Sequence, residues 1–359
     1  MRVIGIVILA VLGVGKVSGQ DRWGKVDGWM ADNTKAMGGR AILVVYKDGK
    51  VEYMKSVNGM SRRQKMVNKF ISRRQGKEAD PGDYTIETRQ PIASCSKWLS
   101  AALVMTFVDE GRLSLSDTVG KYLPVLSQHG KGGITVQECL SHLTGINEPP
   151  LKESIKEMRS VATMDDAIAA IAAMPMEGEP GKVFHYSNAG LQIAGAILEK
   201  ISGKSFQALF AERIAQPLEM KNTDFGKGPV AMPAGGAGST PEDYMHFLVM
   251  ILDKGVYKGR RVLSEKSVAA MQVNRITPAI TIGYSPAQSL GLNGLGYGYG
   301  EWIMGTAVTS PGLFGSFPWV EKEKGYCAFL MTVYVKNDGR GERYTTLKQL
   351  VDEAVDQGR

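Results

Sequence analysis

The sequence has few of the residues that build metal sites and disulfide frameworks, since only 3 Cys and 4 His occur among its 359 residues. An odd, small number of cysteines argues against a disulfide scaffold. One pair could still form among Cys95, Cys139 and Cys327, and the spacing selects none. His-x-His, His-Glu-x-x-His and Cys-x-x-Cys clusters are absent from the sequence, so we expect no metal site and no other cofactor.

Long hydrophobic runs are missing beyond the first residues. An uninterrupted apolar run covers residues 3–14, with Arg2 before it and small residues at 17–19 after it. This three-part layout predicts a secretory signal peptide over residues 1–19. The run is shorter than the roughly 20 residues of a membrane-spanning helix. We therefore expect export to the periplasm or the exterior, without stable membrane insertion once the signal is cleaved.

The charge is not balanced, because the formal net charge is +7 and much of the basic excess lies in residues 61–77. Such a charge run is typical of a solvated loop, and attraction to an anionic surface or polymer is the alternative. No nucleic-acid-binding motif accompanies it, so we expect no nucleic-acid partner. The sequence leaves the role of the wider basic insertion, 61–83, open.

The patterns of hydrophobic residues predict strands near both ends of the chain and helices between them. Asp48-Gly49 between two β-rich runs is a strong hairpin signal. Antiparallel strands from both ends can form one sheet with the helices beside it, which predicts an α+β fold. We expect a single domain over 20–359, with a helical subdomain at roughly 94–225 inserted in it. The predicted elements are a helix at 21–37, a hairpin at 41–57, an extended piece at 88–92, helices from 94 to about 225, strands at 309–320 and 325–335, and a closing helix at 345–355.

Ser94 and Lys97 form a candidate nucleophile and base. They are three residues apart at the start of a predicted helix, so their side chains lie on one face. A serine hydroxyl is a poor nucleophile until a base takes its proton, and a neutral lysine amine can do so. This requires the pKa of Lys97 to fall from about 10.4 to about 7, which costs about 4 kcal/mol. A surface ion pair supplies too little free energy for this shift, so we expect Lys97 to be enclosed.

Tyr186 and Asn188 form a second candidate pair, and no other Tyr in the chain has Asn two residues later. A phenol beside a lysine of lowered pKa can pass a proton between the serine and a leaving group. The amide of Asn188 can hold a substrate carbonyl and help to position Lys97. The structural alternative is a packed Tyr beside an Asn that caps a helix.

Ser-x-x-Lys at 94–97, followed about ninety residues later by Tyr-x-Asn at 186–188, resembles the class C β-lactamases and the related esterases and DD-peptidases. The resemblance implies a β-lactamase/transpeptidase-like fold. In that fold an antiparallel sheet flanked by helices carries a helical subdomain, and the site lies between them. Ser94, Lys97 and Tyr186 would be catalytic and Asn188 would bind substrate. The resemblance also covers the segments 109–124, 134–146, 216–225 and 235–247.

The third motif of the family is changed here. Ser310-Pro311-Gly312 stands where the family has Lys-Thr-Gly or His-x-Gly, which implies that Ser310 and Gly312 bind substrate without a cation. This change favours an ester or amide that lacks a free carboxylate. The resemblance further implies an oxyanion hole made by the backbone N–H groups of Ser94 and Leu313.

Three functions are compatible with these residues. The first is an exported serine esterase or amidase that works through a Ser94 acyl-enzyme on a small ester, amide or lactam. The second is a β-lactamase or DD-peptidase acting on β-lactams or cell-wall peptides, and the third is a non-catalytic binding protein on the same scaffold. Gly-x-Ser-x-Gly is absent from the sequence, which disfavours an ordinary α/β-hydrolase. We interpret His142 and His185 as structural or packing residues, and the oligomeric state stays open.

Overall fold

A computed structural model describes residues 22–74, 80–336 and 338–358. The predicted signal peptide, 1–19, lies outside the described residues. Within the described ranges, no helix has the length and apolar character needed to cross a lipid bilayer. Cys95, Cys139 and Cys327 are all buried and free, so the cysteine pair that the sequence left open does not form.

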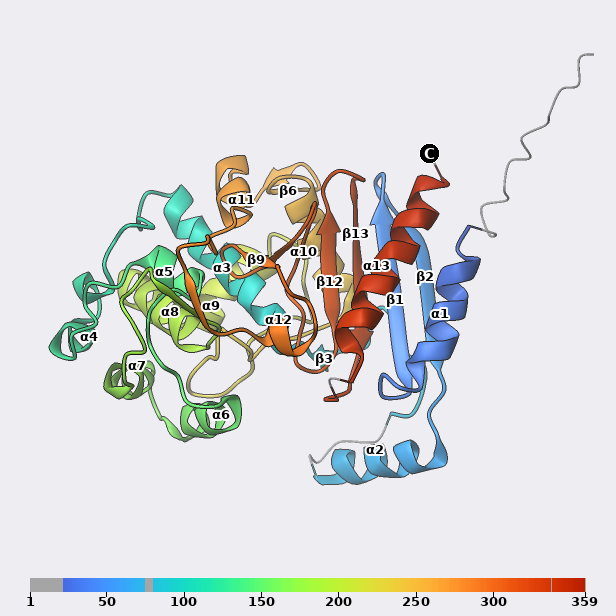
Figure 1. The fold of residues 1–359 in the computed structure, drawn as a ribbon, viewed down its shortest axis with the longest axis horizontal. Coiled ribbons are helices and arrows are strands. Elements are labelled where there is room, and N and C mark those ends of the chain that lie inside the picture. The colour runs from blue at the N-terminus through green and yellow to red at the C-terminus, as the bar shows by residue number, and fades with distance from the viewer. Residues whose placement is uncertain (1–21, 75–79, 337, 359) are drawn as a thin grey trace, which may run out of the picture.

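A seven-stranded antiparallel sheet joins strands from the two ends of the chain (Figure 1). The first strand of the chain pairs with the last, with Ala41 opposite Thr332 and Lys47 opposite Tyr326. This arrangement confirms the predicted α+β fold. In spatial order the strands are β2 (Lys50–Asn58), β1 (Arg40–Lys47), β13 (Tyr326–Thr332), β12 (Phe317–Glu321), β11 (Ala307–Thr309), β10 (Trp302–Met304) and β9 (Gly296–Tyr297).

The turn between β1 and β2 is the one that the sequence predicted. Asp48 and Gly49 both have positive φ, at 50° and 81°. Two consecutive residues with positive φ are the requirement of a type I′ turn, whose twist matches that of the flanking strands. The pairing of Lys47 with Lys50 closes the hairpin directly at this turn.

The two faces of the sheet belong to different hydrophobic cores, because successive side chains of a strand point to opposite faces. On β13, Phe329 packs on the face covered by α3 (Cys95–Asp109) and α10 (Pro241–Leu252). Its neighbour Leu330 packs on the face covered by α1 (Gly24–Thr34) and α13 (Arg340–Asp356), as Figure 1 shows for α13 crossing in front of the strands.

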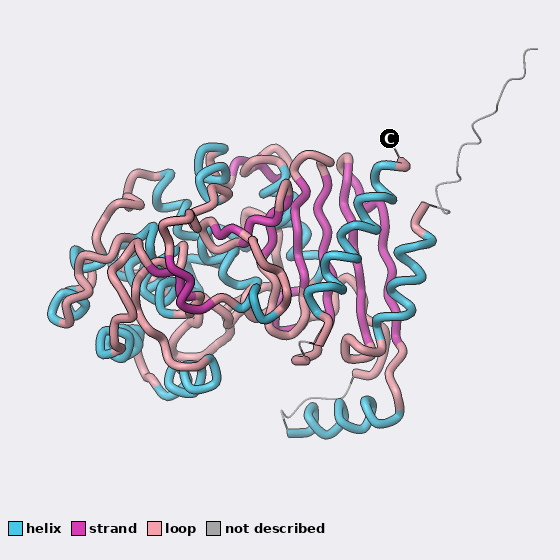
Figure 2. The backbone as a smooth tube through the Cα atoms, viewed as in Figure 1, coloured by secondary structure: helices cyan, strands magenta, loops and turns pink. Residues whose placement is uncertain are grey.

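A helical region lies beside the sheet, at the left of Figure 2, and α3 runs through its centre. Every residue of α3 from Cys95 to Phe107 is buried, and α8, α9 and α11 pack against this helix. The other helices are α4 (Pro124–Gln128), α5 (Val136–Leu140), α6 (Leu151–Ser160), α7 (Met164–Ala173), α8 (Ala189–Ser202), α9 (Phe206–Phe210), α11 (Glu265–Met271) and α12 (Pro286–Ser289). Short strands pair outside the main sheet: β3 (Gln90–Pro91) with β5 (Gly238–Ser239), β4 (Val183–His185) with β8 (Thr281–Tyr284), and β6 (Val256–Tyr257) with β7 (Arg260–Arg261).

The basic segment differs from its prediction as a loop, because it forms helix α2 (Arg62–Arg74). The helix begins with a capping box in which the Ser61 N–H donates to Gln64 Oε1 at 2.8 Å and the Gln64 N–H donates to Ser61 Oγ at 3.2 Å. This Ser-x-x-Gln pattern satisfies backbone donors that a helix start otherwise leaves unpaired. The pattern was present in the sequence, and the run of charge obscured it.

Candidate active site

The start of α3 presents Ser94 at a strained turn. Ala93, directly before it, has a φ of 47°, in the left-handed region that residues other than glycine rarely adopt. Ser96 Oγ accepts from the Ala237 N–H at 3.0 Å, and Ser100 Oγ donates to the Pro233 carbonyl at 2.7 Å. These bonds tie the 233–237 segment to α3, so the turn that carries Ser94 rests on fixed backbone.

A cavity of about 510 Å³ opens at this turn. Its walls come from the turn itself, the segment before α6, the start of α8, the region around α12, and the loop between β11 and β12. Most of the wall is apolar, which suits a substrate with a hydrophobic acyl or leaving group. The lining residues that bear on the chemistry are Ser94, Lys97, Glu148, Tyr186, Asn188, Gly312, Leu313 and Arg340.

Lys97 lies between three oxygen atoms. Its Nζ is 3.3 Å from Ser94 Oγ, 3.3 Å from Asn188 Oδ1 and 2.9 Å from the Ala234 carbonyl oxygen. A neutral amine has two hydrogens and one lone pair. If Asn188 and Ala234 accept the two hydrogens, the lone pair faces the Ser94 hydroxyl, which is the geometry a general base needs.

The enclosure of Lys97 is as the sequence predicted. The residue is 1% exposed, and burial lowers its pKa to about 7, with the nearby Glu148 carboxylate acting in the opposite direction. Burial has this effect because it disfavours the charged form of an amine. Near neutral pH a large fraction of the molecules therefore carry an uncharged amine at this position.

The Tyr186 hydroxyl forms its hydrogen bond with Ser94 and not with the Lys97 amine. Burial raises the pKa of Tyr186, and its hydrogen bond with the Ser94 side chain acts to lower it. Lys97 Nζ lies over the face of the phenol ring, 4.7 Å from its centroid. Any proton transfer between Tyr186 and Lys97 would therefore have to pass through the Ser94 oxygen or a substrate atom.

His142 holds the Tyr186 ring in place, which agrees with its interpretation as a structural residue. Its Nδ1 accepts from the Ser187 N–H at 3.3 Å, so Nε2 carries the hydrogen that is donated to Tyr297 Oη at 3.0 Å. The His142 ring lies 4.5 Å from the ring of Tyr186, and Trp302 stacks on Tyr186 at 5.4 Å. Burial lowers the pKa of His142, so this imidazole is neutral.

Glu148 is a site residue that the sequence reasoning missed. This buried carboxylate accepts from the side-chain amide of Asn188 at 3.1 Å, from the Asn188 backbone N–H, and from the Ala189 N–H at 3.0 Å. The Ser154 hydroxyl also donates to it. The carboxylate therefore caps the first turn of α8, where unpaired N–H groups favour negative charge.

The two predicted oxyanion-hole donors lie on the cavity wall. Among the described residues, neither the Ser94 N–H nor the Leu313 N–H has a hydrogen-bond acceptor, so both can donate to a bound oxygen. Gly312 packs tightly behind them, since a Cβ on it would lie 2.4 Å from the Ile92 carbonyl oxygen. Glycine is required there by this close approach.

Ser310 is not in the position expected for a substrate-binding residue. It is 1% exposed and is not part of the cavity wall, and its Oγ donates to the carbonyl oxygens of Ser94 at 3.1 Å and Gly300 at 3.2 Å. The Ser310 hydroxyl therefore supports, from outside the cavity, the turn that carries Ser94. The prediction placed it in the pocket because a motif match gives sequence position and not side-chain direction.

Arg340, at the start of α13, is a cation on the cavity wall that the sequence reasoning also missed. Its Nη1 donates to the Leu313 carbonyl at 2.8 Å, and its Nη2 donates to the carbonyls of Tyr334 and Lys336. The guanidinium therefore holds the loop that carries one oxyanion donor, and it also brings positive charge to the cavity.

The site offers no cluster for a metal. In the described part of the chain, no group of three or more His, Cys, Asp or Glu residues converges as metal ligands would. His185 lies on the cavity wall with its Nδ1 bonded to Glu177, so it packs at the rim as predicted.

Comparison with known proteins places the chain in a family. The Beta-lactamase family model matches residues 30–353, and the chain belongs to this family of serine hydrolases. The D-alanyl-D-alanine-carboxypeptidase/endopeptidase AmpH of Escherichia coli K12 is 24% identical over 226 residues, which cover 56% of this chain and 59% of AmpH. The chain thus spans less than two thirds of the length of the curated relatives it matches.

Solved structures show the same fold. A candidate beta-lactamase from Bacteroides dorei DSM 17855 matches with a TM-score of 0.76 and 27% identity, covering 93% of this chain and 99% of that one. EstCE1, a hydrolase with promiscuous acyltransferase activity, matches with a TM-score of 0.71 and 17% identity, covering 94% and 99%. The β-lactamase/transpeptidase-like fold that the sequence predicted is confirmed.

Proposed function

We propose that this chain is an exported serine hydrolase that cleaves an ester or amide through an acyl-enzyme on Ser94. The observation that carries the proposal is the enclosed Lys97 amine, which has a pKa of about 7 and lies 3.3 Å from the Ser94 hydroxyl oxygen. A general base is most effective when its pKa is near the working pH. A protein that only binds ligands has no use for such a pair.

In the acylation step, Ser94 Oγ bonds to the substrate carbonyl carbon and its proton passes to Lys97 Nζ. The N–H groups of Ser94 and Leu313 hold the resulting oxyanion. When the bond to the leaving group breaks, Tyr186 gives its phenol proton to that group and recovers a proton from the Lys97 ammonium. Water then attacks the acyl carbon with Lys97 as base, and Ser94 regains its proton as the acid leaves.

Labelling with an active-site-directed fluorophosphonate tests this assignment. The native protein should be labelled, and Ser94→Ala should lose the label and the turnover of acyl esters. Ser289→Ala is the matched control, because Ser289 also lines the cavity but, among the described residues, its hydroxyl bonds only to the Pro286 carbonyl. Equal labelling of Ser94→Ala and the native protein would refute the assignment, and an unlabelled native protein would favour a binding protein.

A second candidate function is the cleavage of cell-wall peptides or β-lactams, which carry a carboxylate. Arg340 on the cavity wall favours it, because it supplies the cation that Ser310 does not. The similarity to AmpH points in the same direction. An ester, a chromogenic cephalosporin and a D-Ala-D-Ala peptide should be compared. If Arg340→Gln lowers kcat/KM for carboxylated substrates far more than for the neutral ester, the second function holds.

The export part of the proposal is supported by the sequence of residues 1–19 alone, with its positive start, apolar run and small residues. Fractionation of expressing cells followed by N-terminal sequencing tests it. An exported protein should begin shortly after residue 19. A cytoplasmic protein that retains residues 1–19 would contradict it.

A further inference from the structure

Helix α2 has an unusual composition for a surface helix, because it contains no acidic residue. A helix face that is only solvated usually mixes both charge signs. Single-sign charge of this density attracts a partner of opposite charge. Its basic residues are Arg62, Arg63, Lys65, Lys69, Arg73 and Arg74.

One side of α2 faces the protein body. Gln64 and Asn68, one turn apart, are the half-buried residues on this side. The Gln64 amide reaches the Lys35 carbonyl at 3.5 Å, near the end of α1. Figure 1 shows that the rest of α2 extends below the sheet, and Figure 2 shows the same helix standing outside the main layers.

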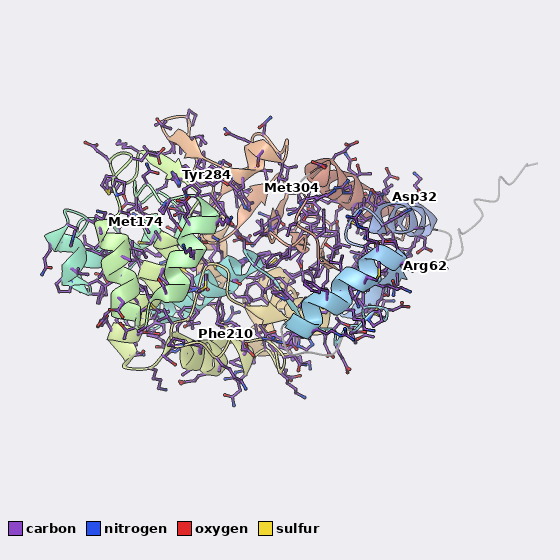
Figure 3. The ribbon with its side chains drawn as sticks, turned by 90° about the horizontal axis from the view of Figure 1, so that it is seen from below. Asp32, Arg62, Met174, Phe210, Tyr284 and Met304 are labelled. Carbon is purple, nitrogen blue, oxygen red and sulfur yellow. The ribbon has the colours of Figure 1, made fainter. Side chains whose placement is uncertain are left out.

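The opposite side of α2 exposes large apolar side chains. Met66 follows Gln64 by two residues, which is about 200° around a helix. Met66 is 67% exposed, and Phe70, one turn further along, is 58% exposed. Val67, on the flank of the helix, is 49% exposed. The helix therefore carries an apolar strip on the side away from the protein. Figure 3, seen from below, shows the helix itself in front of the body, running from Arg62.

Basic side chains flank this strip. Arg62, Lys69 and Arg73 fall within about 60° of Met66 on the helix circumference, and all three are exposed. An interfacial helix has this arrangement, with apolar side chains that enter the acyl boundary and basic side chains that reach the headgroups.

We propose that α2 binds an anionic lipid bilayer, lying parallel to it with Met66 and Phe70 inserted and the basic side chains on the headgroups. Such a surface matches both the charge and the apolar strip of α2, whereas a soluble polyanion would match the charge alone. None of the described side chains of α2 lines the active-site cavity, so the docked enzyme keeps its site as described. The proposal is independent of the proposed function.

Co-sedimentation of the full chain with vesicles tests the proposal. Vesicles of phosphatidylcholine containing phosphatidylglycerol should bind the protein at low salt, and those of phosphatidylcholine alone should bind it weakly. Each basic side chain near an anionic leaflet strengthens binding about fivefold. Replacing three with Arg62→Gln, Lys69→Gln and Arg73→Gln should weaken binding by well over tenfold. The apolar variant, Met66→Ser with Phe70→Ser, should weaken it by roughly tenfold.

Matched controls carry the same changes elsewhere on the surface. Lys221→Gln, Lys227→Gln and Lys266→Gln remove three exposed lysines outside α2, and Val273→Ser with Val335→Ser removes two exposed apolar side chains. Both controls should bind vesicles better than the α2 variants, and all variants should keep the native thermal unfolding curve by circular dichroism, which shows that they fold. Native binding equal to that of the α2 charge variant would overturn the proposal. If the charge variant loses vesicle binding and the apolar variant does not, α2 binds polyanions by charge alone, and the lipid proposal is overturned.

Discussion

Glu148 sets the orientation of Asn188. The Asn188 side-chain nitrogen donates to Glu148 at 3.1 Å, and its side-chain oxygen therefore points to Lys97 Nζ, 3.3 Å away. A side-chain amide has a donor and an acceptor end, and a carboxylate accepts only from the donor end. Glu148 thus directs the Asn188 oxygen at Lys97, although no hydrogen bond among the described residues joins Glu148 to Lys97.

Glu148→Gln should therefore act through Lys97. The loss of negative charge should lower the pKa of Lys97, since Glu148 acts to raise it. In the proposed mechanism the neutral amine is the active form, so the acidic limb of the kcat/KM profile should move to lower pH. We also expect kcat to fall by about tenfold, because the amide that replaces the carboxylate can hold Asn188 in either orientation.

The control for Glu148 is Glu177→Gln, which removes a carboxylate bonded to His185 at the cavity rim. It should leave the acidic limb in place. A Glu148→Gln enzyme with reduced activity and an unmoved limb would show that Glu148 acts only on folding or on substrate binding.

The pH profile of the native enzyme should rise through about pH 7, because the pKa of Lys97 is about 7 and only its unprotonated form accepts the serine proton. Lys97→Arg places a permanently charged group there. We expect a loss in kcat of roughly 10²- to 10⁴-fold, the usual contribution of a general base. Stopped-flow acylation across pH would measure both effects.

Lys131→Arg is the matched control for Lys97→Arg. Lys131 is also buried, burial also lowers its pKa, and its Nζ bonds to the Ala172 carbonyl away from the cavity. It should keep the native profile. A native profile in Lys97→Arg itself would exclude Lys97 as the base.

The sequence could predict the residues whose relation is local. Ser94 and Lys97 share one face because they are three residues apart on a helix, and Asp48-Gly49 gives its turn through backbone preference alone. The sheet followed from strands at both ends of the chain. Tyr186 and Asn188 were found by their motif, and the cavity brings them beside Ser94.

The residues that the sequence could not place depend on tertiary contacts. Glu148 stands in irregular backbone and meets Asn188 from 40 residues away, so no period or cap pattern indicates it. Arg340 bonds to Leu313 from the start of α13, and the residue pattern of this helix does not indicate a cavity. The Ser310 side chain points behind Ser94, because its hydroxyl bonds to the carbonyl groups of Ser94 and Gly300, and the motif does not encode these tertiary contacts.

Gly312→Ala should slow acylation while leaving the fold intact. The added Cβ would meet the Ile92 carbonyl oxygen at 2.4 Å, and a backbone atom cannot move aside cheaply. The loop should shift and carry the Leu313 N–H away from the oxyanion position, and loss of one such donor costs roughly 10²- to 10³-fold in kcat. Burst kinetics with a chromogenic ester would measure the rate. Gly133→Ala is the control, because nothing lies within 4 Å of its added Cβ, and equal rates in the two variants would contradict the prediction.

Glu301 is a buried acid that the proposed chemistry does not use. It is 0% exposed, and neither carboxyl oxygen has a hydrogen-bond partner among the described residues. Burial raises the pKa of Glu301 well above its ordinary value, and Lys322 acts in the opposite direction. Because an unpaired charge is costly to bury, the folded protein holds the proton of this carboxyl to a higher pH than the unfolded chain does.

This raised pKa makes the free energy of unfolding depend on pH. Above the ordinary glutamate pKa of about 4.3, the unfolded chain has released the proton that the folded chain still holds, so stability falls as pH rises. Between pH 5 and pH 7 the contribution of Glu301 to the free energy of unfolding should therefore fall. Glu301→Gln should remove this component, whereas Glu87→Gln, at an exposed acid, should not. Urea unfolding at both pH values would measure it, and an unchanged slope in Glu301→Gln would mean that the carboxyl is ionised in the folded protein.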